Sequence, residues 1–185
     1  MLMTPYLTID TELRSKLKNI KALLSDVDGV LSNGYIYLGN NGNEYKSFNV
    51  KDGCGLVTIQ KYGIKFGVIT GRKSKIVEER MKSLKVEIVY QGIDNKVSSL
   101  QQIMNDYNLK AEEIAYIGDD VIDIPVFEKV GFSATPQDAH PYAKENCDYV
   151  CKLNGGEGAV REICDLIMLA QNVNALTPEK SLWSD

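Results

Sequence analysis

Two groups of acidic side chains each come directly after a short apolar run. Asp26 and Asp28 close the first run and are followed by Gly29. Side chains at positions i and i+2 of an extended segment point the same way, so both carboxylates can face one ligand. Adjacent carboxylates repel each other unless a cation or a shared proton compensates, and Mg²⁺ prefers such oxygen ligands. Asp pairs at strand ends also occur as turn residues, so this group alone leaves both interpretations open.

The second acidic group strengthens the interpretation as a metal site. Asp119, Asp120 and Asp123 follow the apolar run Ile114–Ile117 and Gly118. Asp120 and Asp123 fall on one helical face at i, i+3, where capping of a helix N-terminus is the alternative role. Capping explains neither Asp119 nor the match to the first group. The pattern therefore predicts one Mg²⁺ site, whose candidate ligands are Asp26, Asp28, Asp119, Asp120 and Asp123.

Two smaller signals lie between the acidic groups. Thr70, Gly71 and Arg72 end one apolar run, and Lys96 opens a later helical segment. Each is weak alone, because Thr70 could be a helix cap and Lys96 a surface charge. The carboxyl ends of parallel strands meet at one edge of a sheet, which would bring Thr70 and Lys96 to the acids. A hydroxyl, an ammonium and Mg²⁺ together suit a phosphoryl group, whose charge spreads over three oxygens during transfer.

The elements that must position these residues alternate regularly between strand and helix. Six runs have the short, apolar character of buried parallel strands: Ala22–Ser25, Lys65–Ile69, Val86–Tyr90, Ile114–Ile117, Phe132–Ala134 and Tyr149–Cys151. Six segments between and after them have helical spacing: Lys51–Tyr62, Ser74–Leu84, Lys96–Tyr107, Ile122–Val130, Gln137–Glu145 and Gly158–Ala170. This alternation predicts an α/β fold with a Rossmann-like, doubly wound parallel sheet of about six strands.

One insertion interrupts the alternation. Residues 35–50 flank a Gly/Asn-rich loop and predict a β-hairpin. Asp28 and Thr70 are separated by only 41 residues, and Thr70 and Lys96 by 25, so no separate cap domain fits. We therefore expect one domain over residues 1–185, with a core at about 21–170 and a polar tail at 172–185 that contains Trp183.

Composition excludes several classes of protein. The chain has 185 residues and a formal net charge of −4, which disfavours nucleic acid as a partner. No apolar run reaches the length of about 20 residues that a membrane helix needs, and the N-terminus lacks the pattern of a secretory signal. We therefore expect a cytoplasmic protein without a membrane partner. The four cysteines form no CxxC pair, and with one histidine they predict reduced thiols rather than a zinc site.

The ordered set of motifs resembles the haloacid dehalogenase superfamily of phosphatases. The matching residues are Asp26-Val27-Asp28-Gly29-Val30, Thr70, Lys96 and Gly118-Asp119-Asp120-Val121-Ile122-Asp123. The resemblance implies that Asp26 is the nucleophile and Asp28 the general acid and base, an order that spacing alone does not decide. It implies that Thr70 and Lys96 hold the phosphate. It also implies that Asp26, Asp119 and the backbone carbonyl of Asp28 bind Mg²⁺, supported by Asp120 or Asp123.

Further strings resemble the family of phosphatases that act on 3-deoxy-D-manno-octulosonate 8-phosphate. They are Phe48–Gly53, Ile69–Ser74, Tyr90–Gly92, Gly118–Asp120, Asp138–Pro141 and Gly155–Glu162. The resemblance implies hydrolysis of that sugar phosphate for lipopolysaccharide synthesis, in a homotetramer whose subunits complete each other's sites. Arg72 could pair with the sugar carboxylate, while Lys51, Asp52 and Gly71 are further candidates for substrate binding. Tyr35 and Tyr37 on the hairpin are candidates for the subunit interface.

Three alternative functions are compatible with parts of this pattern. A phosphatase for a nine-carbon ulosonate 9-phosphate shares all the motifs and differs by one carbon in its substrate. A phospho-accepting switch domain also uses Asp, Thr and Lys, but the second acid on the first strand, Asp28, favours turnover. A non-catalytic oligomerisation module is disfavoured because Asp26, Asp28, Thr70 and Lys96 are all present.

Overall fold

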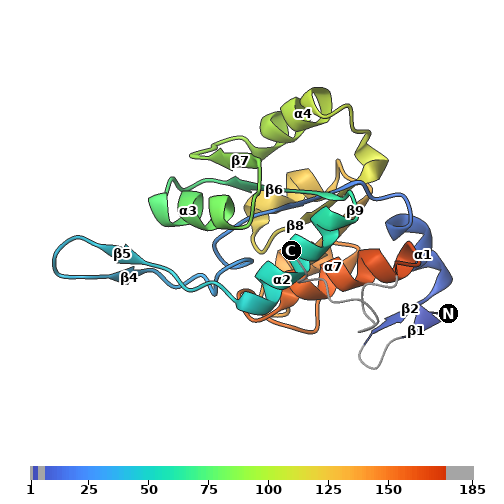
Figure 1. Cartoon of the computed structure of the whole chain (residues 1–185), viewed down its shortest axis with the longest axis horizontal. Helices are drawn as coiled ribbons and strands as arrows, with labels where there is room; N and C mark the ends of the chain where they lie inside the picture. The colour runs from blue at the N-terminus through green and yellow to red at the C-terminus, as the bar shows by residue number, and fades with distance from the viewer. Residues whose placement is uncertain (1, 4–6, 174–185) are drawn as a thin grey trace.

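The computed structural model describes residues 2–3 and 7–173, and its centre is a six-stranded sheet (Figure 1). All the strands are parallel, in the order β10-β9-β8-β3-β6-β7. They span β3 (Ala22–Ser25), β6 (Lys65–Thr70), β7 (Ile88–Gln91), β8 (Ile114–Ile117), β9 (Phe132–Thr135) and β10 (Tyr149–Val150). The predicted doubly wound α/β fold is confirmed.

Helices cover both faces of the sheet because adjacent strand residues face opposite sides. Leu23 packs into the apolar core that α1, α2, α3 and α7 cover, while Leu24 packs into a second core under α4, α5 and α6. The helices span α1 (Thr11–Leu17), α2 (Val50–Lys61), α3 (Lys75–Ser83), α4 (Lys96–Asp106), α5 (Ile124–Phe127), α6 (Pro141–Glu145) and α7 (Ala159–Ala170). No described helix is long and apolar enough to cross a membrane.

The strand order reverses beside β3. The chain first builds the sheet outward through β6 and β7, then returns to place β8, β9 and β10 on the other side of β3. Such a switch point leaves a crevice at the carboxyl ends of the two central strands, where ligands of this architecture bind. Asp26 directly follows β3 and Asp119 follows β8 at the second position, so both lie at this crevice.

The predicted hairpin is present, with a shorter paired region than expected. Strands β4 (Tyr37–Leu38) and β5 (Glu44–Tyr45) pair antiparallel, and the hairpin projects from the body of the molecule (Figure 1). The amide of Gly39 donates to the Asn43 carbonyl at 2.8 Å and closes the loop. Residues 46–49, expected as strand, form the connection to α2 instead.

Several elements differ from the sequence-based expectation. The N-terminal pair β1 (Leu2–Met3) and β2 (Thr8–Ile9) and helix α1 were not expected. Helix α1 is short, and its apolar pattern consists of only Leu13 and Leu17. The segment expected as one helix over 122–130 is a 3₁₀ turn, η2 (Val121–Asp123), followed by α5. A second 3₁₀ turn, η1 (Ala111–Glu113), precedes β8, and Trp183 lies outside the described residues.

One expected helix begins later than its sequence suggested. The interval 137–145 is helical only from Pro141, the first residue of α6. The His140 side chain accepts the Tyr142 amide through Nδ1 at 3.2 Å, so this histidine is the N-cap. Proline has the backbone angle that a first helical turn needs and no N–H to satisfy there, which sets the start of α6 at this point.

Candidate active site

The centre of the site is a buried ion pair between Asp26, which directly follows β3, and Lys96, which lies beyond β7 in the chain. Asp26 is 6% exposed and Lys96, the first residue of α4, is 5% exposed. The Lys96 ammonium lies 2.7 Å from Oδ2 of Asp26 and 2.7 Å from Oδ1 of Asp123. Burial opposes the charged form of Lys96, but the two carboxylates outweigh it and raise its pKa. Lys96 is therefore a permanent cation beside Asp26.

Asp123 is the residue that organises this part of the site. Its Oδ1 accepts from Lys96 and, at 2.7 Å, from the Tyr116 hydroxyl. Its Oδ2 accepts the amides of Asp119 at 3.0 Å and Asp120 at 3.2 Å. A carboxylate has about four acceptor positions, so the hydrogen bonds of Asp123 are complete. Asp123 thus holds Lys96 and shapes the loop that carries Asp119.

Asp119 has the opposite character. Among the described residues nothing donates a hydrogen bond to its carboxylate. Burial raises the pKa of Asp119 to about 8, reinforced by the negative charges of Asp26 and Asp123. Gly29 makes room for this carboxylate, since a Cβ there would overlap it, and Gly29 also has a φ of +87° that disfavours other residues.

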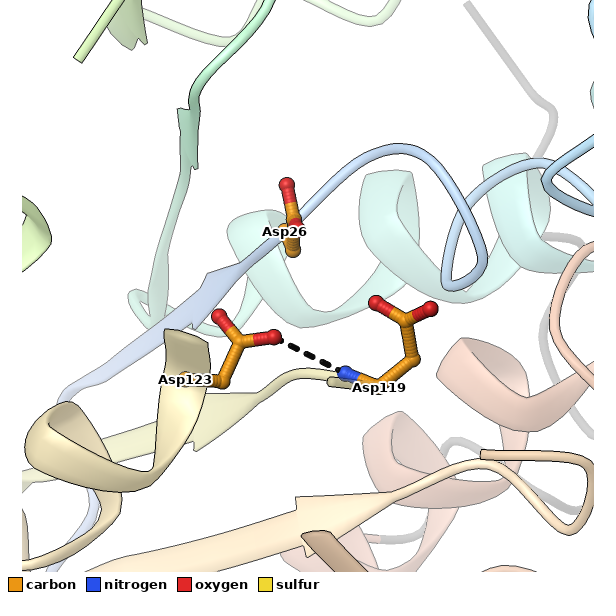
Figure 2. A group of neighbouring side chains, drawn as sticks. All are labelled: Asp26, Asp119 and Asp123. Carbon is orange, nitrogen blue, oxygen red and sulfur yellow. Dashed lines mark hydrogen bonds between the residues drawn. The ribbon is translucent and has the colours of Figure 1, made fainter. Parts of the chain in front are cut away.

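The three carboxylates of Asp26, Asp119 and Asp123 face a common space (Figure 2). One oxygen from each lies within 4.8 Å of the others. Repulsion among the acids that raises the pKa of Asp119 would be relieved by a divalent cation, and carboxylate oxygen is the donor type that hard cations prefer. The site fits such an ion, with Asp119 as its free ligand and Asp26 as a second.

A second charged cluster surrounds Asp28 at the base of the hairpin. The Lys46 ammonium pairs with Oδ1 of Asp28 and lies 3.8 Å from Oε1 of Glu44. Arg72 donates to Oε2 of Glu44 at 2.9 Å, and its Nε lies 3.8 Å from Oδ2 of Asp28. The sequence reasoning did not single out Glu44 or Lys46. Their i, i+2 spacing on the returning hairpin strand was the available signal, because it puts both on one face.

The remaining predicted residues are placed in different surroundings. Thr70 is buried at the end of β6, the neighbour of β3, and Gly71 follows it on the surface. Lys51 is exposed in the first turn of α2. Asp120 is exposed and accepts the Val121 amide at 2.7 Å, the capping role that its sequence position left open. Asp120 is not part of the three-carboxylate group.

Asp52 lies between helices rather than on the surface. It is 2% exposed, and its Oδ1 accepts the amide of Arg161 in α7 at 2.8 Å. The α7 N-cap is Gly158, which has no side chain to perform this function, so Asp52 caps α7 from α2. Burial raises the pKa of Asp52 to about 6, although the α7 amides and Arg161 oppose the shift. The burial of Asp52 and its bond to α7 favour a structural role for it rather than the predicted contact with substrate.

Comparison with known proteins connects this geometry to a family. Residues 85–163 match the family model described as haloacid dehalogenase-like hydrolase. The chain is 47% identical over 170 residues to 3-deoxy-D-manno-octulosonate 8-phosphate phosphatase KdsC of Escherichia coli, an alignment that covers 92% of this chain and 90% of that protein. The chain belongs to the haloacid dehalogenase-like hydrolases. Its similarity to KdsC also makes it a phosphatase, as the motifs predicted.

The tertiary structure of this haloacid dehalogenase-like hydrolase is also similar to solved structures. The 3-deoxy-D-manno-octulosonate 8-phosphate phosphatase of Yersinia pestis has a TM-score of 0.90 at 42% identity, with 92% of each chain covered. The Moraxella catarrhalis phosphatase, solved with magnesium, phosphate and KDO, has a TM-score of 0.87 at 38% identity, with 89% of this chain and 95% of that chain covered. The acidic cluster in this chain is compatible with such a metal.

Proposed function

We propose that this phosphatase hydrolyses 3-deoxy-D-manno-octulosonate 8-phosphate to the free sugar and inorganic phosphate. The observation that carries the proposal is the ion pair between Asp26 and Lys96 at 2.7 Å. Asp28, the proposed general acid and base, lies two residues after Asp26. A carboxylate beside a buried cation suits attack on an anionic phosphate, because the cation offsets their repulsion. The relatives named above supply the substrate class.

The proposed reaction has two steps on one phosphorus atom. An Asp26 oxygen attacks the phosphorus while the bond to the ester oxygen breaks, and Asp28 gives that oxygen a proton so that the sugar leaves as an alcohol. Water then attacks the aspartyl phosphate and gives a proton to Asp28. The bond between phosphorus and Asp26 breaks, which releases phosphate and regenerates both carboxyl groups.

The other site residues bind and orient the phosphate. Lys96 neutralises charge between Asp26 and the phosphoryl oxygens, and Thr70 offers a hydroxyl from the adjacent strand end. We propose Mg²⁺ as the cation of Asp26, Asp119 and the Asp28 carbonyl, where it would neutralise charge on the phosphoryl group. Asp123 acts by fixing Lys96 and the Asp119 loop.

The proposal includes a substrate site next to the hairpin. Arg72 has 49% of its side chain exposed and lies beside Asp28, where it could exchange its contact with Glu44 for the sugar carboxylate. Gly71 and Lys51 are the other candidates for contact with the sugar, since both are exposed. The nine-carbon ulosonate 9-phosphate is the competing substrate.

We further propose a homotetramer in which a neighbouring subunit covers each site. The hairpin supports this assembly, because it exposes a group of large apolar side chains: Tyr35 67%, Ile36 37%, Tyr37 51%, Leu38 76% and Tyr45 56%. A role in lipopolysaccharide synthesis and a cytoplasmic location are part of the same proposal and rest on the resemblance. Sedimentation of a monomer at micromolar concentration would contradict the tetramer.

Steady-state hydrolysis of matched eight- and nine-carbon ulosonate phosphates tests the function. We expect a higher kcat/KM for the eight-carbon substrate, dependence on Mg²⁺ and loss of turnover in Asp26→Asn. A higher kcat/KM for the nine-carbon substrate would show that the proposed substrate is wrong, but the proposed mechanism would still stand. Full activity with a chelator present, or in Asp26→Asn, would refute the mechanism.

A further inference from the structure

The two oxygens of the Asp28 carboxylate have different surroundings. Oδ1 pairs with the Lys46 ammonium, and the Ser32 hydroxyl lies 3.4 Å from it as a weak donor. Oδ2 is buried and has no hydrogen-bond partner among the described residues. Nε of Arg72 lies 3.8 Å from Oδ2, which is too far for a hydrogen bond. One oxygen is therefore held and the other is free to react.

Lys46 is the one lysine of the hairpin region, residues 35–50, and its side chain is deeply buried. Its side chain is 0% exposed, although it follows β5 in a segment that is otherwise largely exposed. Long flexible side chains lose rotamer entropy when they are buried, and a buried ammonium needs ionic partners. Asp28 and Glu44 are those partners, so the base of the hairpin holds a cation against the proposed acid and base.

We propose that Lys46 is a positioning residue for the phosphatase reaction. It holds Oδ1 of Asp28, which leaves Oδ2 as the atom that exchanges the proton with the leaving oxygen and later with water. This inference rests on the proposed role of Asp28. It assigns a function in the reaction to the base of the hairpin, in addition to the interface proposed for its exposed face.

The step that depends on this placement is cleavage of the ester bond. As the bond from phosphorus to the ester oxygen breaks, an alkoxide leaving group needs the proton from Oδ2 of Asp28, whereas p-nitrophenolate leaves without one. Loss of Lys46 should therefore slow cleavage of an alkyl phosphate more than cleavage of p-nitrophenyl phosphate. kcat/KM isolates this difference because it reports the steps through departure of the first product.

Lys46→Met tests the proposal, because methionine keeps much of the apolar stem and removes the ammonium. We expect kcat/KM for the ulosonate phosphate to fall about 30- to 100-fold, within the range of general acid catalysis. With p-nitrophenyl phosphate the fall should be less than about threefold. Lys46→Arg should recover most of the alkyl activity, and Lys82→Met on the exposed surface of α3 is the matched control.

Three results would overturn the role of Lys46. A rise in KM with unchanged kcat would make Lys46 a substrate-binding residue, and an equal loss for both substrates without rescue by Lys46→Arg would make its role structural. Unchanged kcat/KM for the alkyl substrate in Lys46→Met would show that Lys46 has no role in the reaction.

Lys46→Gln replaces Lys46→Met if the latter fails to give the wild-type circular dichroism spectrum. If the wild type does not hydrolyse ulosonate phosphates, another alkyl phosphate that it hydrolyses takes their place in the comparison. Failure of the proposed substrate can then be distinguished from failure of the role proposed for Lys46.

Discussion

Replacement of Asp52 by asparagine separates a structural role from a role in substrate binding. The carboxylate caps α7 through the Arg161 amide, and its Oδ2 is buried without a hydrogen bond. Asparagine keeps an acceptor oxygen for that amide and cannot ionise. The variant should therefore fold, retain the α7 cap and lose the dependence of stability on the charge of this position.

The pKa of Asp52 sets the size and the sign of the effect. Burial raises it from 3.8 to about 6, so the folded state binds the proton more tightly than the unfolded state. The stability of the wild type should then fall as the pH rises through this window, by about 3 kcal/mol in total, since one pKa unit corresponds to about 1.4 kcal/mol. About 2 kcal/mol of this loss in the free energy of unfolding falls between about pH 4.5 and about pH 8, according to the linkage relation.

Urea unfolding of both proteins at several pH values measures this difference. The free energy of unfolding of Asp52→Asn minus that of the wild type should rise by about 2 kcal/mol from about pH 4.5 to about pH 8. This rise is expected whether the variant is more or less stable than the wild type at about pH 4.5. The comparison removes the contribution of Asp165, whose pKa burial raises to about 7, because both proteins contain it. Activity should change by less than about threefold, as expected for a residue outside the substrate site. A pH-independent difference would refute the burial argument, and a KM raised about tenfold would restore Asp52 to the substrate site.

Two further substitutions test the geometry around the carboxylates. Gly29→Ala places a Cβ against the Asp119 carboxylate, at a residue whose φ is +87°. We expect the affinity for Mg²⁺, measured by calorimetry, to fall at least about tenfold, as it does at other disturbed metal sites. Unchanged affinity would exclude Asp119 as a ligand. Tyr116→Phe removes a hydroxyl that is 2.7 Å from Asp123 in a fully buried position, and a hydrogen bond to a charged group contributes about 1.5–3 kcal/mol. Urea unfolding should show a loss of that size, and a loss below about 0.5 kcal/mol would contradict the hydrogen-bond network that we assign to Asp123.

Local sequence signals were sufficient for the sheet and for part of the site. Short apolar strands such as Ala22–Ser25 and Ile114–Ile117 appear where they were expected, because buried parallel strands are apolar on both faces. Asp26, Asp119 and Lys96 could be associated in advance, since each lies at the start of a segment that follows a strand. The short helix α1 was not anticipated, because its apolar pattern is limited to Leu13 and Leu17.

The tertiary structure decided which polar groups are free and which are already paired. Asp119, Asp120 and Asp123 look alike in the sequence, but one is free to bind a cation, one caps a turn and one has all its hydrogen bonds satisfied. The placements of Asp52 on the α7 amides and Lys46 on Asp28 join residues that are 109 and 18 positions apart. Residue types and spacing therefore determined the chemistry available to this chain. Packing between distant segments assigned each carboxylate its part, because burial and hydrogen bonding depend on neighbours that no local pattern specifies.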